Sequence, residues 1–122
     1  MPESLAFASQ FEFTPDNRAV VIALAGKLDP EAVAELHPQI QEVYRAGLRR
    51  FVFDLSALEY SGSLGLRLIV GLQNQVKGQG RVAVCAPSAA LRAMLEMTKL
   101  TAVLPPYPTR AAALDATGEV KG

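Results

Sequence analysis

The chain has 122 residues, of which 50% are hydrophobic and 20% are charged. This composition predicts a single globular domain and excludes a disordered or low-complexity chain. The 12 basic and 12 acidic side chains give a formal net charge of +0, which argues against a protein that binds nucleic acid through a positive surface.

Targeting and redox signals point to the cytoplasm. The single cysteine, Cys85, leaves no intrachain disulfide or cysteine zinc site and suits a reducing compartment. Residues 1–10 lack the charged and apolar regions of a signal peptide, and the longest apolar run, Ala19–Gly26, is far shorter than the ~20 residues of a membrane span. We therefore expect a cytoplasmic protein without membrane insertion, in which one domain (1–116) precedes a loose tail (117–122).

The first two segments predict a β-hairpin. In Phe7–Phe13 the residue types alternate along the strand, so that one face can be exposed to solvent. Arg18–Ala25 is nearly continuously apolar, which is typical of a strand covered on both faces. The segment Thr14-Pro15-Asp16-Asn17 between them has turn chemistry, with Pro15 suited to the second position. The first strand should therefore lie nearer the edge of a sheet.

A helix is predicted after the second strand. Asp29 can accept hydrogen bonds from the first helical amides, Pro30 fits the first helical position, and Gly47 is suited to end the helix. Apolar residues between them recur at helical spacing, namely Val33, Leu36, Ile40, Val43 and Tyr44. Pro38 lacks an N–H group and should kink this helix or split it in two.

The rest of the chain alternates strands and helices. Strands are predicted at Arg50–Leu55, Arg81–Ala86 and Thr101–Leu104, and helices at 63–77, from Pro87-Ser88 onward, and from Thr109 to Leu114. Strands that alternate with helices imply a parallel sheet with covered faces. The predicted fold class is therefore α/β, with a mixed, mostly parallel sheet of about five strands and about four helices.

Residues suited to catalysis are scarce. His37, the only histidine, stands beside Pro38 on a helix and is expected at the surface or its boundary rather than in an active site. Cys85 lies in the middle of a strand, where a buried and unreactive thiol is expected. Because metal-ligand spacing and paired carboxylates are also missing, we expect no enzyme activity, no metal and no cofactor.

The loop Ser61-Gly62-Ser63 is the most unusual feature of the sequence. A strand passes through it directly into a helix, and α/β proteins place their sites in such loops at the carboxyl ends of parallel strands. Ser63 is expected to be the N-cap of that helix. Three interpretations stay open: a plain helix cap, a nucleotide-phosphate cradle, for which the spacing of Gly62 and Gly65 is a weak signal, and a regulatory phosphoserine on a docking surface.

The helix after this loop is apolar over more than one face. Leu66, Ile69, Val70 and Val76 cover one side of a helical wheel, and Leu64, Leu68 and Leu72 extend that side. A helix packed on one side needs a narrower apolar arc. The extra leucines either pack against another element or remain exposed for a partner, and both interpretations stay open.

Three stretches resemble the STAS domain family, and more narrowly the bacterial anti-sigma factor antagonists. They are GKLD (26–29), DLSALEYSGSLGLRLIV (54–70) and LRAMLEMTKLTAVLPPYPTRAAAL (91–114), and the similarity runs from about Phe11 to Leu114. The middle stretch, which holds the strand, the loop and the helix, is the most specific. The resemblance implies a STAS-like fold with the order of elements predicted above.

The resemblance also implies a function by partner switching. In that family the unphosphorylated antagonist binds an anti-sigma factor that is also an ATP-dependent serine kinase, which frees a sigma factor, and phosphorylation of a loop serine ends the binding. Ser63 matches the phosphorylated serine, and Asp29 matches an aspartate that lies beside it on the contact surface. The other expected partner contacts are Ser61, Gly62, Leu64, Arg67 and Leu68.

Two positions depart from the family pattern. Gly62 stands where the antagonists usually carry an aspartate or serine, and Leu64 stands where a small residue is common. Two alternatives therefore stay open beside the antagonist: a STAS subunit that regulates the ATPase of a lipid-transport ABC system, and a small nucleotide-binding sensor domain. The surface leucines allow a weak dimer but do not require one, so a monomer is equally compatible with the sequence.

Overall fold

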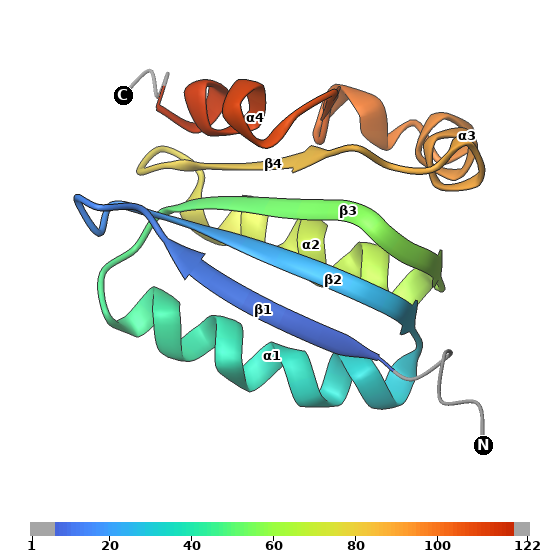
Figure 1. The fold of residues 1–122 in the computed structure, drawn as a ribbon, viewed down its shortest axis with the longest axis horizontal. Coiled ribbons are helices and arrows are strands. Elements are labelled where there is room, and N and C mark those ends of the chain that lie inside the picture. The colour runs from blue at the N-terminus through green and yellow to red at the C-terminus, as the bar shows by residue number, and fades with distance from the viewer. Residues whose placement is uncertain (1–6, 119–122) are drawn as a thin grey trace.

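The computed structural model describes residues 7–118 of the chain. Its elements follow in the order β1 (Ala8–Phe13), β2 (Ala19–Leu28), α1 (Pro30–Arg45), β3 (Arg50–Ser61), α2 (Ser63–Val76), β4 (Arg81–Cys85), α3 (Ala89–Met97), a 3₁₀ turn (Leu100–Ala102), β5 (Pro106–Tyr107) and α4 (Arg110–Thr117). The strands form one sheet in the order β1-β2-β3-β4-β5, with β1 antiparallel to β2 and the other pairs parallel. The predicted α/β class and mostly parallel sheet are therefore confirmed (Figure 1).

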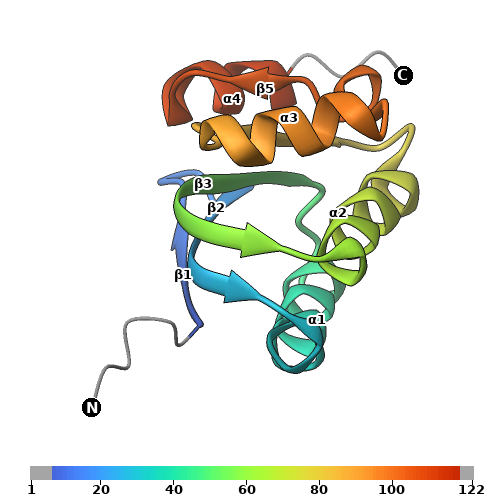
Figure 2. The same cartoon turned by 90° about the vertical axis from the view of Figure 1, so that its right-hand side faces the viewer.

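Helices cover the two faces of the sheet unequally (Figure 2). α1 and α2 lie side by side on one face and enclose the main core, to which β3 contributes Phe51 and Phe53. α4 packs over β3 and β4 on the other face, above a smaller core that includes Val52, Ala83 and Cys85. Successive residues of β3 therefore enter opposite cores, which explains why the inner strands are continuous apolar runs in the sequence.

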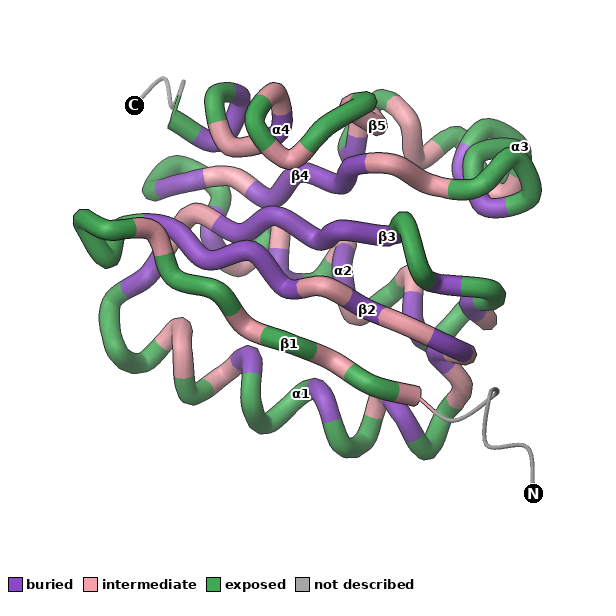
Figure 3. The backbone as a smooth tube through the Cα atoms, in the orientation of Figure 1, coloured by how far each residue is buried: buried purple, intermediate pink, exposed green. Residues whose placement is uncertain are grey.

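Burial along the strands follows these layers (Figure 3). β2, β3 and β4 are buried over most of their length, whereas β1 at the edge of the sheet is exposed or half-buried throughout. The turn between β1 and β2 is closed by the amide of Asn17, which donates to the carbonyl of Thr14 over 2.8 Å, with Pro15 at the second position. The predicted hairpin and its edge strand are confirmed.

The predicted ends of α1 are close to the observed ones, but Pro38 does not divide the helix. Asp29 caps the first turn through its Oδ1 atom, which accepts a hydrogen bond from the amide of Ala32 over 2.9 Å. The helix continues unbroken from Pro30 to Arg45, so the predicted split is wrong. Pro38 and Ala34, whose carbonyl loses its helical partner, are both exposed, and water can satisfy that carbonyl.

β3 extends to Ser61, well beyond the predicted strand Arg50–Leu55. Its pairing with β2 shifts register twice, because β3 holds an extra residue after Asp54 and another after Leu58. Each bulge resets the alternation of faces, so burial in this half of the strand recurs at Leu58 and Ser61 instead of at every second residue. Because this half of β3 lacks period-two alternation, the sequence predicts the strand only as far as Leu55.

The predicted last strand, Thr101–Leu104, is wrong. Its first residues belong to the 3₁₀ turn, and Leu104 is fully buried in the main core. The chain turns here because Lys99, just after α3, has a left-handed backbone with φ 61°. The strand that pairs with β4 is Pro106–Tyr107 instead.

α4 begins as predicted and ends later. The Oγ1 atom of Thr109 accepts a hydrogen bond from the amide of Ala112 over 3.1 Å and caps the helix. The helix continues past the predicted end at Leu114 to Thr117, which is fully buried. The predicted tail (117–122) therefore does not begin at Thr117, and residues 119–122 lie outside the described residues.

Arg110, at the start of α4, joins three elements. Its Nε donates to Oδ2 of Asp54 in β3 over 2.6 Å, and its Nη1 donates to Oε1 of Glu12 in β1 over 2.9 Å. The Oδ1 atom of Asp54 accepts a hydrogen bond from the amide of Ser56 over 3.0 Å and thus satisfies the backbone at the first bulge of β3. Burial raises the pKa of Asp54, but the hydrogen bonds from Ser56 and Arg110 outweigh it and hold the pKa below its usual 3.8.

Replacement of Arg110 by Gln should lower the free energy of unfolding by about 1–3 kcal/mol at pH 7, because the Asp54 carboxylate loses its partner. Since the pKa of Asp54 is lower in the folded state than in the unfolded state, its ionised form stabilises the fold above about pH 4. That contribution disappears as the pH falls through the folded-state pKa, so the difference between wild type and R110Q should shrink in acid. Urea unfolding of wild type and R110Q at pH 7 and at about pH 3 measures this difference in the free energy of unfolding.

Arg92→Gln, at an exposed position of α3, is the control and should change stability little at either pH. A stability loss in R110Q that stays constant from pH 7 to about pH 3 would contradict the role assigned to this ion pair.

Candidate functional site

The carboxyl ends of β2 and β3 bring the starts of α1 and α2 together. Leu28 and Ser61, the last residues of the two strands, are paired, and the amide of Gly62 donates to the carbonyl of Leu28 over 3.4 Å. Both helices begin just beyond these residues, so their amino ends lie at the same edge of the sheet (Figure 2). Between them is a hollow of about 230 Å³, lined by Leu28, Asp29, Pro30, Tyr60, Gly62, Ser63 and Leu64.

Asp29 and Ser63 line this hollow together. Asp29 is half-buried, and because its Oδ1 atom caps α1 it is also a structural residue. Ser63 is exposed at the start of α2. The structure therefore brings the serine and the aspartate expected from the sequence to one surface.

Ser63 does not cap α2, which corrects the prediction. The N-cap is Gly62, whose carbonyl accepts hydrogen bonds from the amides of Gly65 and Leu66 over 3.1 and 3.3 Å, and no side chain caps this end. Because β3 runs on to Ser61, a single residue separates strand from helix, and Ser63 is already helical. Ser63 is exposed, and its hydroxyl is not engaged in a cap.

Ser61 is also placed differently from the prediction. It closes β3, is 2% exposed, and donates through Oγ to the carbonyl of Gly62 over 3.1 Å. A partner cannot reach this side chain while the fold is intact. Ser61 supports the site from beneath, and its predicted place in a loop is wrong because it is the last residue of β3. Its predicted contact with a partner stays a prediction.

Tyr60 is a surface residue of the site that the sequence did not reveal. Its side chain is 48% exposed, and its hydroxyl would lie 3.5 Å from a Cβ atom built on Gly62. In a regular strand Tyr60 would share the inward face with Leu58, but the second bulge of β3 turns it outward. Tyr60 and Leu64, which is 44% exposed, line the same hollow and are two large side chains that the fold leaves at the surface.

Gly65 allows the first turn of α2 to lie directly on the strand ends. A Cβ atom built there would lie 2.5 Å from Oγ of Ser61 and 2.6 Å from Cδ2 of Leu28. Any side chain at this position would push α2 away from β2 and β3. The glycine thereby fixes the distance between Ser63 and the edge of the sheet.

Farther along, α2 forms a ridge between two apolar hollows. Leu64 and Leu68 line the hollow toward α1, of about 370 Å³, and Leu66 and Val70 line the hollow toward the end of α3 and the 3₁₀ turn, of about 510 Å³. The buried residues beneath the ridge are Gly65, Ile69, Leu72 and Val76. The wide apolar arc of this helix therefore has three parts: one stripe in the core and one row beside each hollow.

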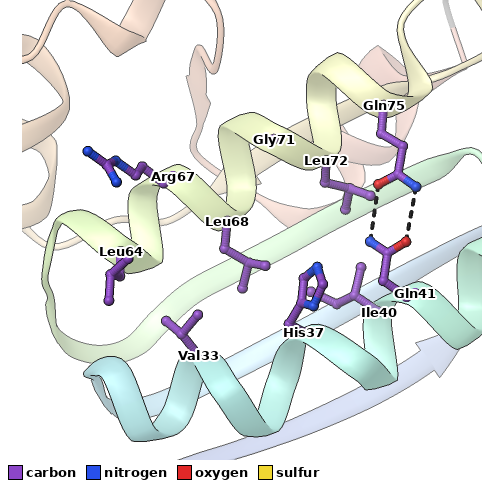
Figure 4. Close-up of a pocket in the computed structure, with 10 residues that line it drawn as sticks. All are labelled: Val33, His37, Ile40, Gln41, Leu64, Arg67, Leu68, Gly71, Leu72 and Gln75. Atoms are coloured by element: carbon purple, nitrogen blue, oxygen red, sulfur yellow. Dashed lines mark hydrogen bonds between the residues drawn. The ribbon is translucent and has the colours of Figure 1, made fainter.

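The crest of the ridge carries Ser63, Arg67 and Gly71, which follow one another at helical-turn spacing. Arg67 and Gly71 line both hollows, and Ser63 lines the hollow toward α3. Figure 4 shows Arg67 pointing away from α1, while Leu64 and Leu68 point toward it. The predicted contacts Leu64, Arg67 and Leu68 are thus continuous with Ser63 on one surface.

Two amides close one end of the hollow toward α1. Gln41 of α1 and Gln75 of α2 exchange hydrogen bonds of 3.1 and 3.0 Å (Figure 4). His37 is exposed, as predicted, and its side chain extends from α1 toward α2 across this hollow. The amide pair ties the two helices together beside the ridge.

Cys85 is fully buried, as predicted, and burial raises the pKa of its thiol to about 11. The thiol is therefore protonated near neutral pH. Within residues 7–118, no three His, Cys, Asp or Glu side chains are grouped so that they could hold a metal ion. The same part of the chain contains no helix with the length and apolar character needed to cross a membrane.

Comparison with known sequences identifies the family. Residues 11–105 match the family described as "Mlab, STAS domain". The chain belongs to the STAS domain family. This STAS domain is 27% identical over 84 residues to the anti-sigma-F factor antagonist RsfB of Mycobacterium tuberculosis, with 69% of each chain covered.

Solved structures share the fold. An anti-sigma factor antagonist from Mycobacterium paratuberculosis superposes with a TM-score of 0.83 at 26% identity, covering 93% of this chain and 96% of that one. The Bacillus cell fate determinant SpoIIAA in its phosphorylated form superposes with a TM-score of 0.70 at 24% identity, covering 89% of this chain and 98% of that one. The predicted STAS-like fold and the resemblance to anti-sigma factor antagonists are confirmed.

Gly65→Ala should destabilise the STAS domain by about 1–3 kcal/mol, because the added methyl group overlaps Ser61 and Leu28. Gly71→Ala is the matched control in the same helix. A Cβ atom there meets nothing within 4 Å, so this substitution should stabilise the domain by about 0.5–1 kcal/mol. Urea unfolding measures both variants, and a G65A domain as stable as wild type would contradict the close packing of α2 on the strand ends.

Proposed function

We propose that this STAS domain is an anti-sigma factor antagonist that binds an anti-sigma factor with serine kinase activity and is released when Ser63 is phosphorylated. One observation carries the proposal: an exposed serine without a capping bond lies at the start of α2 and shares a hollow with Asp29 and the exposed Leu64. The antagonists among its relatives and structural neighbours support the same assignment.

A phosphate on Ser63 would change this surface more than the fold. It adds about −1.5 to −2 charges beside Tyr60 and Leu64, and a partner that buries these side chains would have to desolvate the phosphate as well. The phosphate would also share the hollow with the Asp29 carboxylate, whose charge has the same sign. A partner that covers the hollow would have to bury both negative charges together away from water, so the modified form should dissociate from its partner.

The activity in this proposal is binding, with no chemistry performed by the domain itself. His37 lies on α1 at the hollow beside the ridge, whereas Cys85 is buried under α4 in the smaller core, so these two side chains do not form a nucleophile and base pair. The kinase partner supplies the chemistry in this scheme. The domain would act in the cytoplasm, where the sigma factor engages transcription.

Ser63→Asp should weaken binding of the anti-sigma kinase by about tenfold or more, because a fixed charge replaces the hydroxyl on the contact surface. Ser63→Ala should bind as wild type does and should take up no phosphate. The measurement is a pull-down from native lysate with wild type and both variants, in which captured proteins and bait phosphosites are identified by mass spectrometry.

Ser88→Asp is the matched control for added charge at an exposed serine. Ser88 caps α3 by accepting a hydrogen bond from the amide of Leu91 over 3.2 Å, and aspartate can keep that cap. The S88D variant should bind the anti-sigma kinase as tightly as wild type does. Unchanged kinase binding by S63D, or phosphate at another serine with Ser63 unmodified, would contradict the proposed switch.

A second candidate is regulation of the ATPase of a lipid-transport ABC system. The observation that favours it is Gly62, which stands at the N-cap of α2 where the antagonists usually carry an aspartate or serine before the phosphorylated residue. In that case the same pull-down would recover a transporter ATPase equally with wild type and S63D, and Ser63 would carry no phosphate.

A further inference from the structure

Gly71 differs from the other glycines in the described part of the chain. The other glycines in residues 7–118 each have a structural reason. Three have a positive φ (Gly26, Gly47 and Gly78), and two leave no room for a Cβ atom (Gly65 and Gly80). The remaining two cap helices (Gly62 and Gly118). Gly71 lies inside α2, is exposed, and a Cβ atom built there would meet nothing within 4 Å. Neither the backbone nor the packing of this domain explains a glycine at that position.

Because Gly71 has no side chain, the ridge of α2 is lower at this residue, and we call this low point the saddle. Glycine in a helix interior weakens the helix relative to alanine, so the domain is less stable than its fold allows. The side chains one turn before and after it, Arg67 and Gln75, stand on either side of a stretch of bare helix backbone. A second backbone can approach α2 more closely here than at any position that bears a side chain.

Apolar surface flanks the saddle on both sides. Gly71 lines the hollow toward α1 with Val33 and Leu68, and it also lines the hollow toward the 3₁₀ turn with Val70 and Leu100. The two hollows, of about 370 and 510 Å³, can each receive apolar side chains from an element that crosses the ridge.

The charge beside the saddle is positive. Arg67 lines both hollows, and none of the residues within 7–118 that line either hollow is an aspartate or glutamate. A partner element that carries a carboxylate among apolar side chains would be complementary to this surface.

We propose that a helix of the anti-sigma factor crosses α2 at Gly71, with its backbone against the glycine, apolar side chains in the two hollows and a carboxylate at Arg67. The inference rests on the proposed function for the identity of the partner. A helix fits because residues three and four apart project from one face and can straddle a ridge. The crossing lies about 12 Å along α2 from Ser63, so one partner can cover both positions.

Gly71→Gln tests the crossing. Glutamine favours helix, and its Cβ atom meets nothing within 4 Å, so the variant should fold with a melting temperature at or above that of wild type. Its added side chain occupies the saddle, and its affinity for the purified anti-sigma factor, measured by calorimetry, should fall about tenfold or more. Ala111→Gln adds a polar side chain at an exposed position of α4, across the sheet, and should bind as wild type does.

A crosslink identifies the partner element. Asn74→Cys places a thiol on the hollow toward the 3₁₀ turn, and a photocrosslinker can be attached to it selectively because Cys85 is buried. Crosslinks should map to one helical segment of the anti-sigma factor that carries apolar residues and an Asp or Glu. Crosslinks to another kind of segment, or equal affinity of G71Q and wild type, would overturn the crossing and leave the proposed function standing, whereas a wild type that binds no anti-sigma factor would refute both.

Discussion

The fold and the surface of this STAS domain both depend on the contact between the first turn of α2 and the ends of β2 and β3. Gly65 lies so close to Leu28 and Ser61 that a Cβ atom does not fit between them. This contact buries Ser61 under the helix and leaves Ser63 exposed at the amino end of α2. One glycine thereby helps to determine which of the two serines is buried and which is exposed to solvent.

The second half of β3 makes that contact possible. Without its two bulges, a strand of regular alternation would turn Tyr60 toward the core. The Asp54 carboxylate satisfies the Ser56 amide at the first bulge and binds Arg110 of α4, so the bulge is tied to the opposite layer of the fold. The position of the surface that carries Tyr60, Ser63 and Leu64 is therefore set from both faces of the sheet.

The sequence predicted the elements whose pattern is local and missed those that depend on tertiary contacts. α1, with its Asp29 cap, and the apolar strands were readable because periodicity and capping act within a few residues. The end of β3 was not, because bulges replace its alternation with burial at Leu58 and Ser61. The predicted N-cap at Ser63 is wrong for a related reason: β3 runs on to Ser61, so Gly62 is the N-cap and Ser63 is already helical. Asp29 and Ser63 could be placed on one surface only through a family resemblance, since helical spacing says nothing about neighbouring strand ends.

The position of Ser63 at the first helical residue, and not at the N-cap, suits a switch that leaves the fold intact. An N-cap serine would lose its hydrogen bond to the helix backbone on modification, whereas the hydroxyl of Ser63 makes no such bond. The first turn of α2 carries no acidic residue, and Arg67 lies one turn beyond, so the amino end of the helix favours added negative charge. A phosphate there would stabilise α2 while it opposes a partner that must bury Leu64 and Tyr60. Modification would then change the affinity of the surface without melting the helix that presents it.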